Sequence, residues 1–181
     1  MIADAMPKPP AEVIALDAER LQWPGQALAA GERFRLLYAS KPALAARIGA
    51  QVQGAGQSWL LPAQPSNAPD AISEPLRKRF RYLPSGVLLA LPEAAQRALP
   101  ELLRGQLLVV REDSAGRVLA LSRIQHAGAL DALYAPRAAS LPLGVEIAPG
   151  ATAFALWAPT ATQVTACLYD NGRSRSARLL A

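Results

Sequence analysis

Residues 107–123 have the sequence LLVVREDSAGRVLALSR. The two apolar runs, residues 107–111 and 118–123, are rich in Leu and Val, a composition that favours β-strands. Between them, residues 112–116 are Glu, Asp, Ser, Ala and Gly, which is typical of a hairpin loop. The stretch therefore predicts a β-hairpin and indicates a mostly β fold for the chain around it.

Further short strands are expected on both sides of this hairpin. Residues 33–38, RFRLLY, alternate arginines with Phe34 and Leu36, so one face of that strand should be wet and the other dry. The 16 prolines and 12 glycines of the chain argue against a helical bundle, because both residues break long helices. The other predicted strands are residues 12–16, 57–61, 152–157 and 163–169.

Few helices are expected. Residues 93–104 predict a short helix that Pro100 interrupts, and residues 126–134 predict a connector for which a helix is one option. Residues 62–75 are rich in Pro, Ser, Asn and Asp and predict a loop. The basic run at residues 77–81, followed by Tyr-Leu-Pro, predicts a half-buried strand with a wet face.

Composition excludes several classes of protein. The 181 residues are 51% hydrophobic and 18% charged, which is typical of a globular chain that can bury a core without disulfide bonds or bound metal ions. The net charge of +5 includes basic runs at residues 77–81 and 173–178, but no nucleic-acid-binding module accompanies them, so a solvated basic face is expected. No apolar stretch approaches the length of a membrane span. The first ten residues do not form a signal peptide, which implies a cytoplasmic protein if they are the true N-terminus.

No catalytic, cofactor-binding or metal-binding residue is expected in this chain. His126 is the only histidine, no serine lies in a Gly-x-Ser-x-Gly motif, and no phosphate-binding glycine loop is present. One Cys and one His cannot supply a zinc site, and Cys167 is expected to be a small buried side chain in a strand. The acidic residues expected to serve turns and helix caps are Asp17, Glu19, Asp113 and Asp131.

Aromatic side chains are the candidates for contact with a sugar, because sugar rings stack on exposed aromatic faces. By strand alternation, Phe154 and Leu156 lie on one face of the predicted strand and Trp157 lies on the other. Both faces of the strand are therefore apolar, and packing of Trp157 in a core or interface is favoured over a sugar platform. The same preference holds for Trp23, which precedes a Pro-Gly turn. The candidate contacts with a glucan or a neighbouring domain are Trp157, Trp23, Trp59 and Tyr169.

The C-terminal part of the chain resembles a known family. The resemblance is carried by Gly144-Val145, by the turn at Pro149-Gly150, by residues 154–161 (FALWAPTA), and by Val164 and Leu168-Tyr169. This pattern is similar to the start of the early-set β-sandwich that precedes the catalytic barrel in debranching enzymes of glycoside hydrolase family 13. That domain is often grouped with carbohydrate-binding module family 48.

The upstream part narrows the resemblance. Residues 21–25 (LQWPG), 34–38 (FRLLY) and 127–135 (AGALDALYA) resemble the β-sandwich domain before the early set in pullulanases, the α-1,6-glucosidases that debranch starch. The resemblance implies a mostly β fold in which an immunoglobulin-like β-sandwich precedes an incomplete early set. The expected parts are a flexible tail at residues 1–11, the accessory β-sandwich at residues 12–140, and the first early-set strands at residues 141–181.

The resemblance also implies a function. No position matches the catalytic motifs of the family, so the chain is expected to be a non-catalytic accessory region that positions a catalytic barrel and contacts α-glucan such as pullulan, amylopectin or glycogen. Two strands cannot close a sandwich, so the apolar residues of the early-set strands need a cover. A stand-alone carbohydrate-binding module and a protein-interaction module remain alternatives. The oligomeric state stays open.

Overall fold

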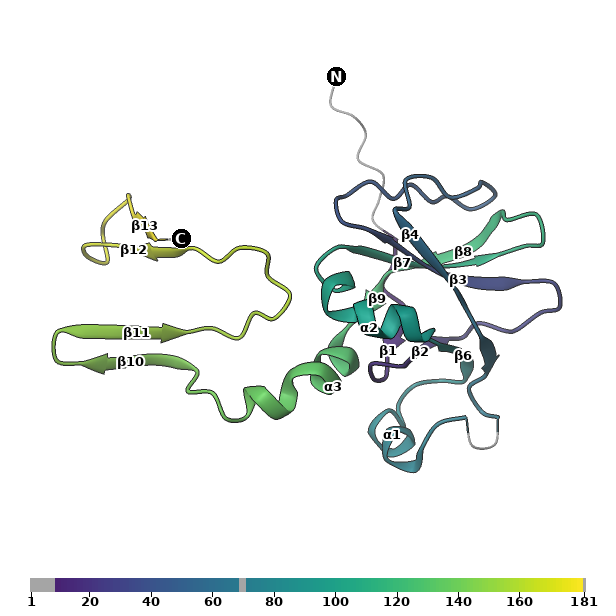
Figure 1. Cartoon of the computed structure of the whole chain (residues 1–181), viewed down its shortest axis with the longest axis horizontal. Helices are drawn as coiled ribbons and strands as arrows, with labels where there is room; N and C mark the ends of the chain where they lie inside the picture. The colour runs from purple at the N-terminus through teal and green to yellow at the C-terminus, as the bar shows by residue number, and fades with distance from the viewer. Residues whose placement is uncertain (1–8, 69–70, 181) are drawn as a thin grey trace, which may run out of the picture. The chain divides into compact units, whose positions relative to one another are not determined.

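The computed structural model describes residues 9–68 and 71–180 (Figure 1). The chain divides into two compact units, one ending at Pro142 and one beginning at Leu143. Most of the tail expected at residues 1–11 lies outside the described residues. No helix in the described ranges is both long enough and apolar enough to cross a membrane.

The first unit contains two sheets. The five-stranded sheet has the order β5 (Ala63–Pro65), β6 (Gly86–Ala90), β2 (Arg20–Pro24), β1 (Val13–Ala15) and β9 (Ile124–Gln125). The four-stranded sheet has the order β4 (Gln57–Leu61), β3 (Arg33–Ala39), β7 (Gln106–Glu112) and β8 (Val118–Ser122). Within these sheets β1 and β9 pair in parallel, and the other described pairs are antiparallel.

The predicted hairpin at residues 107–123 is confirmed as β7 and β8. Asp113 closes its loop, because its Oδ1 accepts hydrogen bonds from the backbone N–H groups of Ala115 (2.9 Å) and Arg117 (2.8 Å). Gly116 follows with φ 78°, a left-handed conformation that glycine adopts without a steric penalty. The alternation predicted for β3 is also confirmed, since Phe34 and Leu36 are buried in the core and Arg33 and Arg35 face the other way.

The inner faces of the two sheets pack against each other and form one core. Trp23 from β2 meets Phe34 from β3 edge to face, with 6.2 Å between ring centroids. Leu99 and Leu102 of helix α2 (Glu93–Leu102) pack into the same core. The first unit is thus a β-sandwich, and the predicted mostly β fold is confirmed.

A second apolar cluster lies on the outer face of the four-stranded sheet. Leu37, Val110 and Val118 are buried there beneath Leu44 and Val52, which belong to the segment between β3 and β4. The Oε1 atom of Gln106 fastens this segment, because it accepts hydrogen bonds from the N–H groups of Ala43 and Leu44, both at 3.1 Å. A long irregular segment therefore serves as a second covering layer.

The basic run at residues 77–81 is not the predicted strand. It begins inside helix α1 (Glu74–Arg79), and β5 and the start of α1 occupy part of the predicted loop at residues 62–75. Pro75 lies in the first helical turn, where its missing N–H costs nothing. Glu74 in the first turn and three basic residues in the last turn also complement the helix dipole.

Two further helices bear out the expectations at residues 93–104 and 126–134. Helix α2 contains Pro100 without ending there. Helix α3 (Ala127–Ala138) begins where β9 ends, and a side chain on Gly128 would meet the carbonyl oxygen of Ala15 on β1. The start of α3 is therefore held close against the five-stranded sheet.

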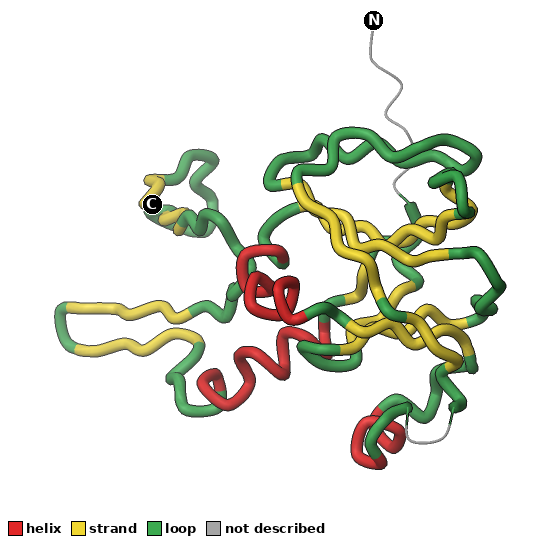
Figure 2. Tube along the Cα trace, turned by 45° about the vertical axis from the view of Figure 1, so that its right-hand side comes forward, coloured by secondary structure: helices red, strands yellow, loops and turns green. Residues whose placement is uncertain are grey.

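The second unit consists of two separate two-stranded ribbons (Figure 2). Strands β10 (Gly144–Ala148) and β11 (Ala151–Ala155) form one ribbon, and β12 (Ala166–Leu168) and β13 (Arg178–Leu180) form the other. The predicted strand at residues 152–157 ends early, at Ala155, and the one at residues 163–169 shrinks to β12. Cys167 is exposed rather than buried, because no second layer of the described unit covers β12.

Candidate functional site

The four aromatic residues singled out from the sequence do not converge on one site. Trp23 is 0% exposed, and its Nε1 donates a hydrogen bond to Glu12 Oε2 at 3.2 Å. Its aromatic faces are covered by the core, which is the packing that the sequence favoured for Trp23, and direct glucan contact is left to the other three candidates. Trp59 is half-buried on β4 of the other sheet and packs against the same core. Trp157 and Tyr169 belong to the second unit, where both are exposed.

Of the four acidic residues expected in turns and caps, Asp17 and Asp113 hold turns. Asp17 Oδ1 accepts hydrogen bonds from the N–H groups of Glu19 (2.8 Å) and Arg20 (2.7 Å). The carboxylate of Glu19 instead pairs with Arg20, and Asp131 lies inside α3, where it forms an ion pair with Arg79 of α1. The predicted cap at Asp131 is therefore wrong, and the residue links two helices.

One face of the β10–β11 hairpin is apolar and uncovered within the second unit. The register places Val145 opposite Phe154 and Ile147 opposite Thr152, so these side chains share a face. Val145, Ile147 and Phe154 are 60%, 82% and 65% exposed. We call these three side chains the hairpin face; apolar groupings of this kind typically mark interaction surfaces.

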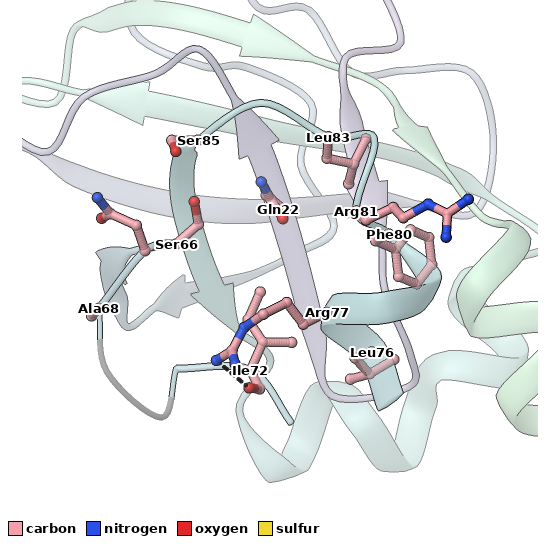
Figure 3. Close-up of a pocket in the computed structure, with 11 residues that line it drawn as sticks. Gln22, Ser66, Ala68, Ile72, Leu76, Arg77, Phe80, Arg81, Leu83 and Ser85 are labelled. Carbon is pink, nitrogen blue, oxygen red and sulfur yellow. Dashed lines mark hydrogen bonds between the residues drawn. The ribbon is translucent and has the colours of Figure 1, made fainter. Parts of the chain in front are cut away.

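A pocket of about 380 Å³ lies on the outer side of the five-stranded sheet (Figure 3). We call it the α1 pocket. The lining residues come from β2, from the segment between β5 and α1, from α1, and from the segment between α1 and β6. They are Gln22, Ser66, Asn67, Ala68, Ile72, Leu76, Arg77, Phe80, Arg81, Leu83 and Ser85. Figure 3 shows Gln22 between Ser66 and Ser85 on one side and Phe80, Arg81 and Leu83 on the other.

Gln22 is the buried polar group of this pocket. It is only 4% exposed, and its Nε2 donates a hydrogen bond to the carbonyl oxygen of Pro84 at 2.9 Å. None of the described residues donates to its Oε1. Sequence analysis missed Gln22, although the polar residue between Leu21 and Trp23 on an alternating strand marks the outer face of the sheet.

The arginines of the pocket differ in their pairing. Arg77 donates from Nη1 to Glu74 Oε2 at 2.9 Å and from Nη2 to the carbonyl oxygen of Ile72 at 3.2 Å. Arg81 is exposed and has no hydrogen bond or ion pair with any described residue. The pocket thus contains the guanidinium of Arg77, which is paired with Glu74, and the guanidinium of Arg81, which is unpaired among the described residues. Neutral amide and hydroxyl groups lie beside them.

Two ionisable residues outside this pocket, the buried Glu112 and the half-buried His126, have packing roles. Glu112 is 1% exposed and accepts from Arg33 Nε and Arg35 Nη1, each at 3.2 Å. His126 borders an apolar hollow of about 10 Å³, too small for a ligand, and burial lowers its pKa below the usual 6.5. Within residues 9–68 and 71–180, no group of three or more His, Cys, Asp or Glu side chains could hold a metal ion.

Comparisons with known proteins agree on one family. The family model described as the Pullulanase N2 domain matches residues 11–132. A pullulanase of Klebsiella pneumoniae is 34% identical over 102 residues, which are 56% of this chain and 9% of that protein. The chloroplastic pullulanase 1 of Arabidopsis thaliana is 37% identical over 76 residues, which are 42% of this chain and 8% of that protein. The matched regions thus span less than a tenth of these two relatives.

Solved structures extend the similarity to both units. The crystal structure of PulA from Klebsiella oxytoca has a TM-score of 0.71 at 28% identity, and the match covers 96% of this chain and 15% of that chain. A maltotriose complex of PulA from Klebsiella pneumoniae has a TM-score of 0.68 at 26% identity, and the match covers 98% of this chain and 17% of that chain. The match therefore includes most of the second unit as well as the β-sandwich.

Proposed function

The chain belongs to the pullulanase N2 domain family, and from this premise we propose that it positions the catalytic barrel of a starch- and pullulan-debranching α-1,6-glucosidase and contacts its α-glucan substrate. The family match covers the β-sandwich at residues 11–132. The first unit is accordingly an accessory region of pullulanase type. The second unit, as the first strands of an early set, is the part proposed to meet the rest of the enzyme.

The exposed hairpin face carries the positioning role. A two-stranded ribbon is marginally stable in water by itself, and its apolar side chains gain about 25 cal/mol for each Å² that a partner removes from water. The match to the solved relatives covers only 15% and 17% of their chains, so those proteins contain much more polypeptide than the 181 residues of this chain. We therefore infer that the polypeptide that carries the catalytic barrel packs on Val145, Ile147 and Phe154 and removes them from water.

The proposed glucan contact is supported by similarity to proteins solved with a glucan. The structure of PulA from Klebsiella pneumoniae is described as a maltotriose complex, and so is that of a variant of it. On this chain Trp157 and Tyr169 present exposed aromatic surface and Trp59 presents part of its surface. Exposed aromatic faces of this kind are suited to stack on sugar rings.

The positioning role is tested first on the gene. The reading frame beyond codon 181 is expected to encode the rest of an early set and a barrel with paired carboxylates, as glycosidic hydrolysis requires. In the full enzyme, Phe154→Asp should lower the melting temperature and the kcat/KM for pullulan. Ala155→Asp, which places the same charge on the other face of β11 and opposite Gly144, is the matched control.

Two results would count against the positioning role. Unrelated sequence beyond codon 181 would remove the barrel that the chain is proposed to position. Equal effects of Phe154→Asp and Ala155→Asp would show that the hairpin face is not covered in the enzyme.

A further inference from the structure

We propose that the α1 pocket binds a short segment of an α-glucan chain and is a sugar contact of the first unit separate from Trp59. The inference rests on the glucan contact proposed for this chain. It differs from the sequence-based candidates, because Trp23 is fully buried and Trp59 belongs to the other sheet. The carrying observation is a buried polar side chain with a free acceptor in a pocket of suitable size.

The size and walls of the pocket suit a sugar. Its volume of about 380 Å³ falls within the range of small-ligand sites, about 300–1,000 Å³. One wall is apolar, formed by Leu76, Phe80 and Leu83, and can pack against the C–H face of a pyranose ring. The Phe80 ring is itself held by the guanidinium of Arg79, whose Cζ lies 5.2 Å from the ring centroid.

The polar groups match hydroxyls. A sugar hydroxyl can donate to the unpaired Oε1 of Gln22 and accept from a neighbouring donor at the same time. The hydroxyl-bearing Ser85 and the exposed Arg81 lie on either side of Gln22 (Figure 3). Oε1 is not among the buried unpaired polar atoms of the described residues, so it is open to the pocket, where a ligand hydroxyl can replace solvent.

The charge distribution favours a neutral ligand over a phosphate. Arg77, the arginine of α1 that lines the pocket, already has its charge balanced by Glu74 at 2.9 Å. A phosphate site typically gathers several free cations or backbone N–H groups, whereas here Arg81 is the free cation among the described lining residues. Neutral amides and hydroxyls make up the remaining polar lining.

A second hollow on the same sheet face leaves room for a further sugar. It measures about 180 Å³ and is lined by Arg20, Gln64 and Leu88, among others. Leu88 lies directly opposite Gln22 in the β2–β6 register, and Arg20 precedes Gln22 by two residues and so shares its face. The two hollows are therefore neighbours along β2, an arrangement that suits a chain more than a single sugar.

The test is a titration of the 181-residue chain with maltotriose, followed by heteronuclear NMR. The binding variants are Phe80→Ala and Arg81→Ala, which both line the pocket. The controls are Ile48→Ala and Lys78→Ala, which are exposed residues outside the lining. Each variant's melting temperature is compared with that of the parent chain, so that a loss of binding is not confused with unfolding.

The pocket is supported if the parent chain binds maltotriose and each pocket variant weakens binding about tenfold, the effect of losing one good contact. The controls should bind as the parent does. The backbone amide signals of residues 66–68, 80–83 and 85 and the side-chain amide signal of Gln22 should shift on binding.

Three other results would overturn the inference, each in a distinguishable way. Equal binding by all variants, with shifts near Trp59, Trp157 or Tyr169, would move the glucan contact elsewhere and leave it standing. No maltotriose binding would remove both the pocket and the glucan contact but not the barrel-positioning role, which the hairpin variants test. Binding of inorganic phosphate at these residues without maltotriose would make the pocket an anion site.

Discussion

Gly128, the second residue of α3, lies so close to β1 that a Cβ placed on it would be 2.1 Å from the carbonyl oxygen of Ala15. The carbonyl oxygen of Leu16 would be 2.5 Å away. Both obstacles are backbone atoms, which cannot rotate aside as a flexible side chain can. This contact therefore sets how closely the helix that ends the first unit approaches its sheet.

The first prediction concerns this contact. Gly128→Ala should lower the free energy of unfolding by about 1–3 kcal/mol, because the added methyl forces α3 away from β1. Urea denaturation would measure the change. Gly56→Ala is the control, since its Cβ would meet Tyr38 O at an ordinary 3.6 Å. Equal stabilities of the two variants would mean that α3 is free to shift.

The second prediction concerns Ser122, whose buried Oγ accepts hydrogen bonds from the N–H groups of Glu12 (2.8 Å) and Val13 (3.0 Å). Ser122→Ala should destabilise the chain by about 2 kcal/mol, because both donors lose their acceptor. Hydrogen exchange at residues 12 and 13 should become faster. Ser58→Ala, at an exposed site on β4, should change neither measurement.

The third prediction concerns the buried carboxylate of Glu112. Glu112→Gln keeps the shape but removes the charge that Arg33 and Arg35 share, and should cost about 1–3 kcal/mol of stability. The cost stays below that of a fully buried pair because both arginines are partly exposed. Glu74→Gln, which breaks an exposed pair, should cost less than about 1 kcal/mol. A larger loss of stability from Glu74→Gln than from Glu112→Gln would contradict the stabilising role given to the buried carboxylate of Glu112.

The fourth prediction concerns pH. Burial holds the pKa of His126 below 6.5 in the folded chain, so the unfolded chain binds more protons as pH falls through that value. Stability should therefore be lost as pH is lowered below about 6.5, and the loss is complete below the folded pKa. His126 is the only histidine, so His126→Leu should remove this part of the pH dependence. If the stability of His126→Leu depends on pH between 7.5 and 5.5 as that of the parent chain does, the pH dependence comes from carboxylates and not from His126.

The fifth prediction separates the two units. In the 181-residue chain, Phe154→Ala should change the free energy of unfolding by less than about 0.5 kcal/mol, because Phe154 is exposed. Phe34→Ala, in the core of the sandwich, should cost about 3–5 kcal/mol. A large effect of Phe154→Ala would mean that the hairpin face is already covered in solution, for example by a second copy of the chain.

The sequence by itself determined the β class, the β7–β8 hairpin, the alternation of β3 and the pullulanase resemblance. These features depend on strand alternation, turn residues and short motifs, which act between neighbours along the chain. Asp113 holds its turn as expected because the acceptor and both donors lie within four residues.

Only the tertiary structure decided which residues are covered and which are free. The basic run at residues 77–81 is predicted from the sequence to be a strand, but most of it lies in α1, which begins with Glu74 and Pro75 in its first turn. Trp23 is buried because Phe34 of the other sheet packs on it, and Cys167 is exposed because nothing described packs on β12. The α1 pocket likewise joins Gln22 to residues about 60 positions later in the chain, a distance that strand periodicity cannot span.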